Sequence, residues 1–189
     1  VRTAAEKTED GSAYILNGTK LWTTNGTLAK LLVVMALDPR THKISAFIVE
    51  TEWKGVVIRN RCRFMGLKAL SNAVIHFDNV RVPAENLVGG EGRGLKIALT
   101  TLNDGRLSIP NISAGTVKAA LETVRNWAGS RVQWGRPVGR HEAIGHKIAD
   151  MAATAFAMEA LVELATQMSD RGGADIRLEA AAAKDWNSV

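Results

Sequence analysis

The sequence predicts an α+β fold, in which an antiparallel β-barrel or sandwich domain is followed by a bundle of long antiparallel helices. Short apolar runs separated by Gly, Pro, Asn and Asp fill residues 1–90, as in an all-β domain. Beyond residue 94, apolar residues recur at intervals of three and four, which is the period of amphipathic helices. We therefore expect a β domain over residues 1–90 and an incomplete helical domain over residues 91–189.

The first half of the chain should hold seven or eight strands. Each run is rich in Val, Ile, Leu or aromatic residues and is bounded by turn-forming residues. The runs at 31–37 and 44–50 are the clearest, since Asp38-Pro39 ends the first of them. The others are predicted at 1–8, 14–16, 21–24, 55–58, 73–77 and 80–82.

Residues 17–26 are the most informative stretch, because they contain two Asn-Gly pairs. Asn-Gly supplies the positive φ angles of a two-residue hairpin turn, so we expect a hairpin at Asn17-Gly18. Trp22 and Thr24 would then lie two apart on one strand and face the same way. This pair suits a planar heteroaromatic ligand, although the spacing alone favours a hairpin whose Trp packs in a core.

The second half should contain three helical segments. The first, from Leu95 to Val124, is either one very long helix or two, with a kink at Pro110. The second runs from about residue 142 to the Gly pair at 172–173, and Asp175 is a candidate N-cap for the third. The glycine-rich residues 89–94 lack the lysine of a phosphate loop and favour a flexible hinge.

Composition limits the remaining possibilities. The chain of 189 residues is 46% hydrophobic and 23% charged, as expected of a globular protein. A single cysteine, Cys62, excludes an intrachain disulfide, and no Cys/His spacing suggests a metal site. Its apolar runs are short for a bilayer, and the chain begins with Val and stops within a helical pattern. We therefore expect a piece of a longer, cytoplasmic protein, or of a mitochondrial matrix protein if the source is eukaryotic.

The net charge of +5 would permit a nucleic-acid partner, but none is expected, because the chain has no run of five basic residues. Arg59, Arg61 and Arg63 would alternate along one face of a strand, with Lys68 close behind. Such a stripe could meet phosphates or could be a solvated face of the sheet.

With these pieces in place, the chain resembles the acyl-CoA dehydrogenase family over essentially its whole length. Four segments carry the resemblance in the family's order and spacing, namely residues 17–26 (NGTKLWTTNG), 77–87 (FDNVRVPAENL), 102–106 (LNDGR) and 131–137 (RVQWGRP). Residues 102–106 and the stretch from 168 to 183 look most like the very-long-chain branch. The resemblance implies an enzyme that removes an α proton from an acyl-CoA thioester and passes a β hydride to the N5 atom of FAD.

The resemblance also implies flavin-contacting residues. Trp22 would form a wall beside the isoalloxazine ring, and Thr24 would place its hydroxyl near N5. A second group would reach the FAD of a neighbouring subunit, near its pyrophosphate and adenine. This group consists of Arg131, Gln133 and Trp134, followed by the pair His141 and Glu142. His141 could instead be a helix-start residue that faces water, and Glu142 replaces the usual Gln.

For the substrate, the resemblance places Asn103 and Arg106 on the long helix beside the pantetheine arm of acyl-CoA. Phe64 matches a position near the CoA adenine. The catalytic base of some branches would fall at Gly105, which cannot act as a base, so no catalytic residue is expected in this chain and the base should follow Val189.

Several partners and alternatives follow from the same family. FAD, acyl-CoA, an electron-transfer flavoprotein or similar acceptor, and a homodimer or homotetramer are implied. The piece alone should be inactive. An acyl-CoA oxidase shares the fold and most of the motifs, and a DNA-binding relative without dehydrogenase activity is a further alternative.

Overall fold

A computed structural model describes residues 1–173 and 175–188 of the chain. It divides into two compact units, Val1–Leu99 and Thr100–Val189, which are described separately below. The first unit is formed by strands and the second by helices, so the predicted α+β class is confirmed.

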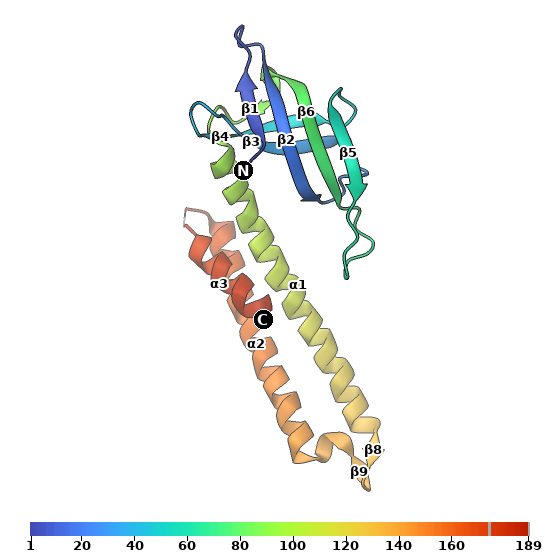
Figure 1. The fold of residues 1–189 in the computed structure, drawn as a ribbon. Coiled ribbons are helices and arrows are strands. Elements are labelled where there is room, and N and C mark those ends of the chain that lie inside the picture. Colours follow the sequence, from blue (N-terminus) through green and yellow to red (C-terminus); the bar gives the residue numbers. More distant parts are fainter. Residues whose placement is uncertain (174, 189) are drawn as a thin grey trace. The chain divides into compact units, whose positions relative to one another are not determined.

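The first unit is built on one seven-stranded sheet in the order β5-β6-β2-β1-β3-β4-β7. The sheet is strongly curved, so that β3 and β4 cross behind β1, β2 and β6 (Figure 1). All its pairs are antiparallel except the single contact of β1 with β3. The strands are β1 (Ala4–Lys7), β2 (Ala13–Thr23), β3 (Leu31–Leu37), β4 (Ile44–Glu50), β5 (Val56–Arg61), β6 (Ala73–Pro83) and β7 (Leu87–Val88), with a 3₁₀ turn, η1, at Ala84–Asn86.

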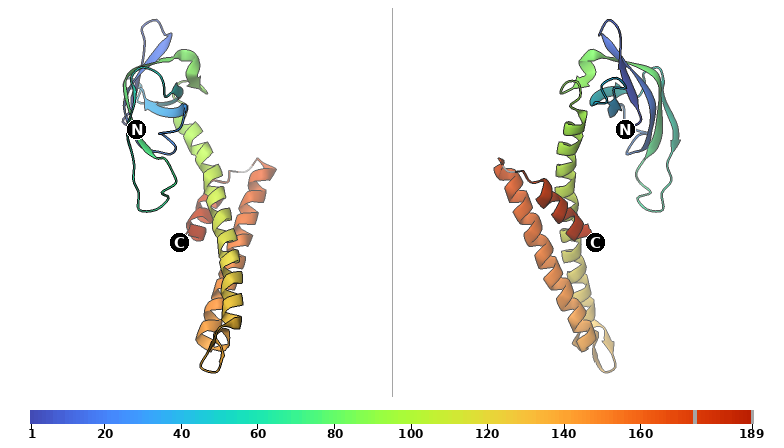
Figure 2. Two further views of the ribbon diagram at one scale, coloured as in Figure 1. Left: turned by 90° about the vertical axis from the view of Figure 1, so that its right-hand side faces the viewer. Right: turned by 60° about the vertical axis from the view of Figure 1, so that its left-hand side comes forward.

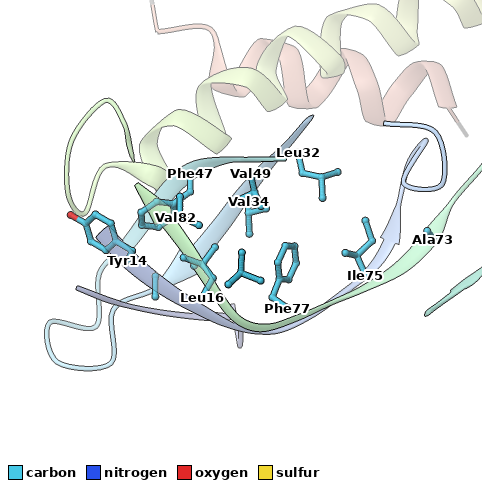
Figure 3. Close-up of a cluster of buried hydrophobic side chains, with 13 residues drawn as sticks. Tyr14, Leu16, Leu32, Val34, Phe47, Val49, Ala73, Ile75, Phe77 and Val82 are labelled. Atoms are coloured by element: carbon cyan, nitrogen blue, oxygen red, sulfur yellow. The ribbon is translucent and has the colours of Figure 1, made fainter. Parts of the chain in front are cut away.

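The core of this unit lies in the concavity of the curved sheet. Alternating residues of β3 are buried, and the intervening ones face outward, as the period of a strand requires. Leu16, Ile75 and Phe77 from one side of the sheet point toward Val34 and Phe47 from the other (Figure 3). Sheet curvature thus lets a single sheet close its own core.

The predicted hairpin at Asn17-Gly18 is wrong, because both residues lie inside the continuous strand β2. Gly18 has φ of +140° and sits at a bulge where the register between β2 and β6 shifts. A Cβ atom there would come within 2.7 Å of the Cα atom of Thr3. The glycine therefore permits a bulge and a close backbone approach, where the sequence alone suggested a turn.

Two further details of the strands differ from the sequence prediction. A bulge between Ile58 and Asn60 interrupts the alternation of β5, and Arg63 lies beyond the end of that strand. The three arginines therefore do not form one stripe. The two strands predicted at 73–77 and 80–82 are a single eleven-residue strand, β6.

The glycine-rich segment that follows β7 is fastened to the sheet rather than hanging free as a hinge. The carboxylate of Glu91 accepts hydrogen bonds from Lys7 Nζ at 2.7 Å and from the Tyr14 hydroxyl at 2.5 Å. The pKa of Glu91 is lowered chiefly by the bond from Lys7. The backbone N–H of Gly92 donates to Ser45 Oγ at 2.9 Å, so this segment has a defined path.

The second unit is helical. The first predicted helix is a single one, α1 (Gly94–Ser130), which contains Pro110 and begins in the sheet unit. A short hairpin of β8 (Val132–Gln133) and β9 (Arg136–Pro137) follows, and then a 3₁₀ turn, η2 (Val138–Arg140). Figure 2 shows α2 (Glu142–Arg171) returning beside α1 in the opposite direction, with α3 (Arg177–Ser188) packed against α2.

Most of the buried helical residues are small. The buried apolar ones include Ala114, Ala128, Ala155, Met158, Val162, Ala165, Ala180 and Ala183, and Pro110 and Asn187 are buried as well. Asp175 lies two residues before α3, where its carboxylate accepts the backbone N–H of Arg177 and binds the guanidinium of the same residue. Within the described residues, no helix has both the length and the apolarity to cross a membrane.

Candidate functional site

The first part of the candidate site is the end of β2. Trp22 is 67% exposed and has φ of +55°, next to a register shift between Lys20 and Thr23. Thr24 lies in the turn that follows and is also exposed. The two side chains are therefore not aligned by strand alternation, as the sequence suggested, although both are presented to solvent at the same end of the strand.

A cavity of about 350 Å³ opens beside this strand end. Thr24 lines it together with Lys20 and with core side chains that include Ile75 and Phe77. Lys20 donates to the carbonyl oxygen of Met35 at 2.5 Å, and burial lowers the pKa of its ammonium group. The sequence did not identify Lys20 as a site residue, because the residues beside it in the sequence do not show that its side chain contacts the core.

Phe64 lies elsewhere in the sheet unit, on the loop between β5 and β6. It lines a cavity of about 490 Å³ with three cations, Arg61, Arg63 and Lys68, and with Cys62, Leu67 and Leu70. The guanidinium of Arg61 donates to the Lys68 carbonyl at 3.1 Å, which closes the loop on itself. This pocket combines an aromatic ring with positive charge, which are complementary to a base and its phosphates.

Asn103 and Arg106 occupy the same face of α1, one turn apart. The Arg106 guanidinium donates to Asn103 Oδ1 at 3.2 Å, and both residues are half-buried. Gly105 lies next to them, and a Cβ atom there would meet nothing within 4 Å. The structure thus brings together the two residues that the resemblance assigned to the substrate arm.

The remaining group surrounds the β8–β9 hairpin after α1. Trp134 is 85% exposed at the tip of the hairpin, and its ring meets that of His141 edge to face at 5.6 Å. Gln133 is half-buried, whereas Arg131 and Glu142 are exposed. The Glu142 Oε1 atom lies 3.8 Å from Nε2 of His146, which is one helical turn further along α2.

The Asn103–Arg106 pair lies in the first half of α1, whereas the hairpin group follows the end of that helix. From Arg106 to its end at Ser130 the helix rises by roughly 36 Å, at about 1.5 Å per residue. Within one chain, the Asn103–Arg106 pair and the hairpin group are therefore too far apart to contact the same small ligand.

Comparison with protein families assigns both units. The acyl-CoA dehydrogenase middle-domain model matches residues 1–80, and the acyl-CoA dehydrogenase C-terminal-domain model matches residues 92–188. The second match alone covers more than half of the chain. The chain belongs to the acyl-CoA dehydrogenase family.

Individual relatives agree with this assignment. The chain is 56% identical to the probable acyl-CoA dehydrogenase FadE10 of Mycobacterium tuberculosis, over 95% of this chain and 28% of that protein. It is 36% identical to the bovine mitochondrial very long-chain specific acyl-CoA dehydrogenase, over 100% of this chain and 30% of that protein. The chain thus spans less than a third of the length of these relatives.

Solved structures show the same architecture. Butyryl-CoA dehydrogenase of Megasphaera elsdenii is similar with a TM-score of 0.90 and 35% identity, over 99% of this chain and 49% of that chain. The prolyl acyl carrier protein oxidase AnaB has a TM-score of 0.92 and 29% identity, over 100% and 50%. An acyl-CoA dehydrogenase of Bacillus anthracis complexed with FAD has a TM-score of 0.79 and 32% identity, over 98% and 32%.

Proposed function

We propose that the intact protein oxidises acyl-CoA thioesters to α,β-unsaturated thioesters with FAD as its cofactor. The observation that carries this proposal is that family matches cover both units in the order middle domain then C-terminal domain. FAD, when bound, accepts the hydride that leaves the β carbon, while a base takes the α proton. The relatives include very long-chain and butyryl-CoA enzymes, so the proposal extends to acyl-CoA thioesters as a class.

The residues at the end of β2 fit a flavin ring. The exposed indole of Trp22 offers a flat apolar wall. The hydroxyl of Thr24 makes no hydrogen bond within the described part of the chain, and it is free to donate to a polar ring edge. The partly buried Lys20 adds a positive charge near the cavity, which would favour a ligand that gains negative charge on reduction.

The hairpin group would contact the nucleotide end of FAD from a neighbouring subunit. The separation of roughly 36 Å along α1 supports this division, because the hairpin and the Asn103–Arg106 pair are too far apart to serve the same part of one site. Arg131, Arg136 and Arg140 place three cations near the hairpin, which suits a pyrophosphate. A homodimer or homotetramer is the corresponding assembly, and an electron-transfer flavoprotein is the proposed electron acceptor.

Anaerobic stopped-flow mixing of the intact FAD-loaded protein with acyl-CoA tests the proposal. The flavin absorbance should bleach, and mass spectrometry should find a product two hydrogens lighter than the substrate. A series from butyryl-CoA to very-long-chain acyl-CoA would assign the preferred length. Bound FAD that stays oxidised with every member of the series would contradict the proposed function.

An oxidase is the second candidate, because AnaB matches the whole chain at a TM-score of 0.92. The two functions share the reductive half-reaction and differ in how electrons leave the flavin. Mixing the substrate-reduced protein with oxygen separates them. Rapid reoxidation with formation of peroxide indicates an oxidase, and slow reoxidation that is accelerated by an electron-transfer flavoprotein indicates a dehydrogenase.

A further inference from the structure

The β8–β9 hairpin is too short to hold its own shape. Only two residue pairs join its strands, Val132 with Pro137 and Gln133 with Arg136. Isolated hairpins are marginal even when they are longer. Its tip, Trp134-Gly135, has φ of +50° and +78°, as a two-residue hairpin turn requires. A bulky residue at positive φ is unfavourable, so contacts outside the hairpin must hold the turn.

His141 supplies those contacts. Its Nε2 lies 3.2 Å from the carbonyl oxygen of Gln133, and its Nδ1 accepts a hydrogen bond from Arg136 Nε at 3.3 Å. Because a carbonyl can only accept, Nε2 is the donor to Gln133, and Nδ1, which accepts from Arg136, carries no hydrogen. One imidazole therefore joins both strands of the hairpin, at the pair adjacent to the turn.

The backbone of His141 is itself firmly anchored. Its N–H donates to the Val138 carbonyl at 3.1 Å, and its own carbonyl accepts from Ile144 and Gly145 at 2.9 Å each, at the start of α2. The side chain does not cap the helix. It is directed to the hairpin instead, where its ring also meets the edge or face of the Trp134 indole.

We infer that His141 is a positioning residue, which clamps the hairpin so that Trp134 is presented in one orientation. This differs from the expectation that His141 itself contacts flavin, since both of its ring nitrogens are already used within the chain. The consequence for cofactor binding rests on the proposed function: a fixed indole binds the nucleotide of a neighbouring subunit without first losing its own conformational freedom.

The test is made on the intact protein labelled with 5-fluorotryptophan, with the ¹⁹F resonance of Trp134 identified by its loss in Trp134→Phe. In His141→Ala that resonance should shift, while the other tryptophans and the melting temperature stay near wild type. The dissociation constant of FAD should rise by about tenfold, which corresponds to the loss of two modest hydrogen bonds. His141→Gln, whose amide can reach the Gln133 carbonyl, should recover most of both effects.

His146→Ala is the matched control, because His146 lies in the first turns of α2 and its side chain faces Glu142 rather than the hairpin. It should leave the Trp134 resonance unmoved. An unchanged Trp134 resonance in His141→Ala would overturn the clamp, and should that variant fail to fold, Arg136→Ala gives the same readout. A resonance that moves while FAD affinity stays at the wild-type value would support the clamp and overturn the proposed nucleotide contact.

Discussion

The cores of the two units are built from side chains of different size, although both units also expose some large apolar residues. In the sheet unit, Phe77 is 1% exposed and belongs to a core of large apolar residues. In the helical unit, Phe156 is 76% exposed, and the buried positions of α2 and α3 are mainly alanines. Several other large apolar side chains of the described helices are also exposed, including Leu102, Ile109, Ile112, Trp127, Leu164, Leu178 and Trp186.

This difference indicates where each unit obtains its stability. A curved sheet closes its own core, because its two ends face each other across the concavity. The long helices have apolar faces that extend beyond what they cover for each other, and contiguous exposed apolar surface marks an interaction site. We therefore expect the sheet unit to tolerate isolation better, and the helical unit to depend on further packing such as the proposed subunit contacts.

Replacing one phenylalanine in each unit gives the clearest test of this difference in packing. Phe77→Ala should lower the free energy of unfolding by about 3–5 kcal/mol, because it leaves a cavity in a closed core. Phe156→Ala should change it by less than about 0.5 kcal/mol in a dissociated subunit and should weaken assembly instead. Urea denaturation and sedimentation velocity measure the two effects. Equal losses of stability would show that the helical unit also has a closed core.

Replacing one glycine in each unit should change the free energy of unfolding by smaller amounts and in opposite directions. Gly18→Ala should destabilise by about 2 kcal/mol, because its Cβ would meet Thr3 at 2.7 Å and its φ is +140°. Gly115→Ala, within α1 where a Cβ would meet nothing within 4 Å, should stabilise by about 0.5–1 kcal/mol. Thermal unfolding of both variants measures the difference. A neutral Gly18→Ala would mean that the bulge can move along β2.

The two units should also divide the proposed flavin chemistry between them. Thr24→Val should slow flavin reduction by the equivalent of about 1–3 kcal/mol in the barrier, because a donor is lost. Arg131→Ala should instead weaken both FAD binding and the association of subunits, because one exposed cation that serves both contacts is lost. Stopped-flow reduction and sedimentation with flavin absorbance separate the two. A stable flavin-loaded monomer would contradict the shared site.

Acid titration should give the smallest effect. The pKa of Asp175 is lowered to about 2 by its hydrogen bonds with Arg177, and that of Glu91 is lowered chiefly by Lys7. Because the pKa of Asp175 is lower in the folded chain than its ordinary value of 3.8, the ionised carboxylate stabilises the fold at pH values above 3.8. This stabilisation is lost as the pH falls from 3.8 through about 2. Carboxyl resonances followed by NMR should titrate below their ordinary values. Ordinary values for both would show that these exposed pairs do not persist in solution.

Local patterns predicted those elements whose character is set by nearby residues. The bounds expected for β3 and β4 are those observed, because each is a short apolar run bounded by turn-forming residues. The bulge at Gly18 could not be predicted, since Asn-Gly suits a turn equally well. The choice depends on Thr3, which is fifteen positions away and is brought beside Gly18 only when β1 pairs with β2.

The candidate site shows the same limit. The motifs identified Trp22, Thr24 and Trp134, all of which the structure presents on the surface. The motifs gave no sign that Lys20 lines the cavity beside Thr24, or that His141 contacts both strands of the hairpin. Both facts follow from tertiary contacts, and sequence spacing does not encode these directly.

The tethered glycine-rich segment at 89–94, within the first unit, has a consequence for limited proteolysis. By composition, the glycines at 89–94 look like the natural cleavage point of the chain. Yet Glu91 and Gly92 are hydrogen-bonded to the sheet, and a Cβ on Gly94 would meet the backbone of Ser45 at 2.5 Å, so a protease cannot draw this stretch into its cleft without detaching it. The loop around Met65, which is 96% exposed, is the better substrate. The first cleavage should therefore fall between β5 and β6 and leave the segment at 89–94 intact.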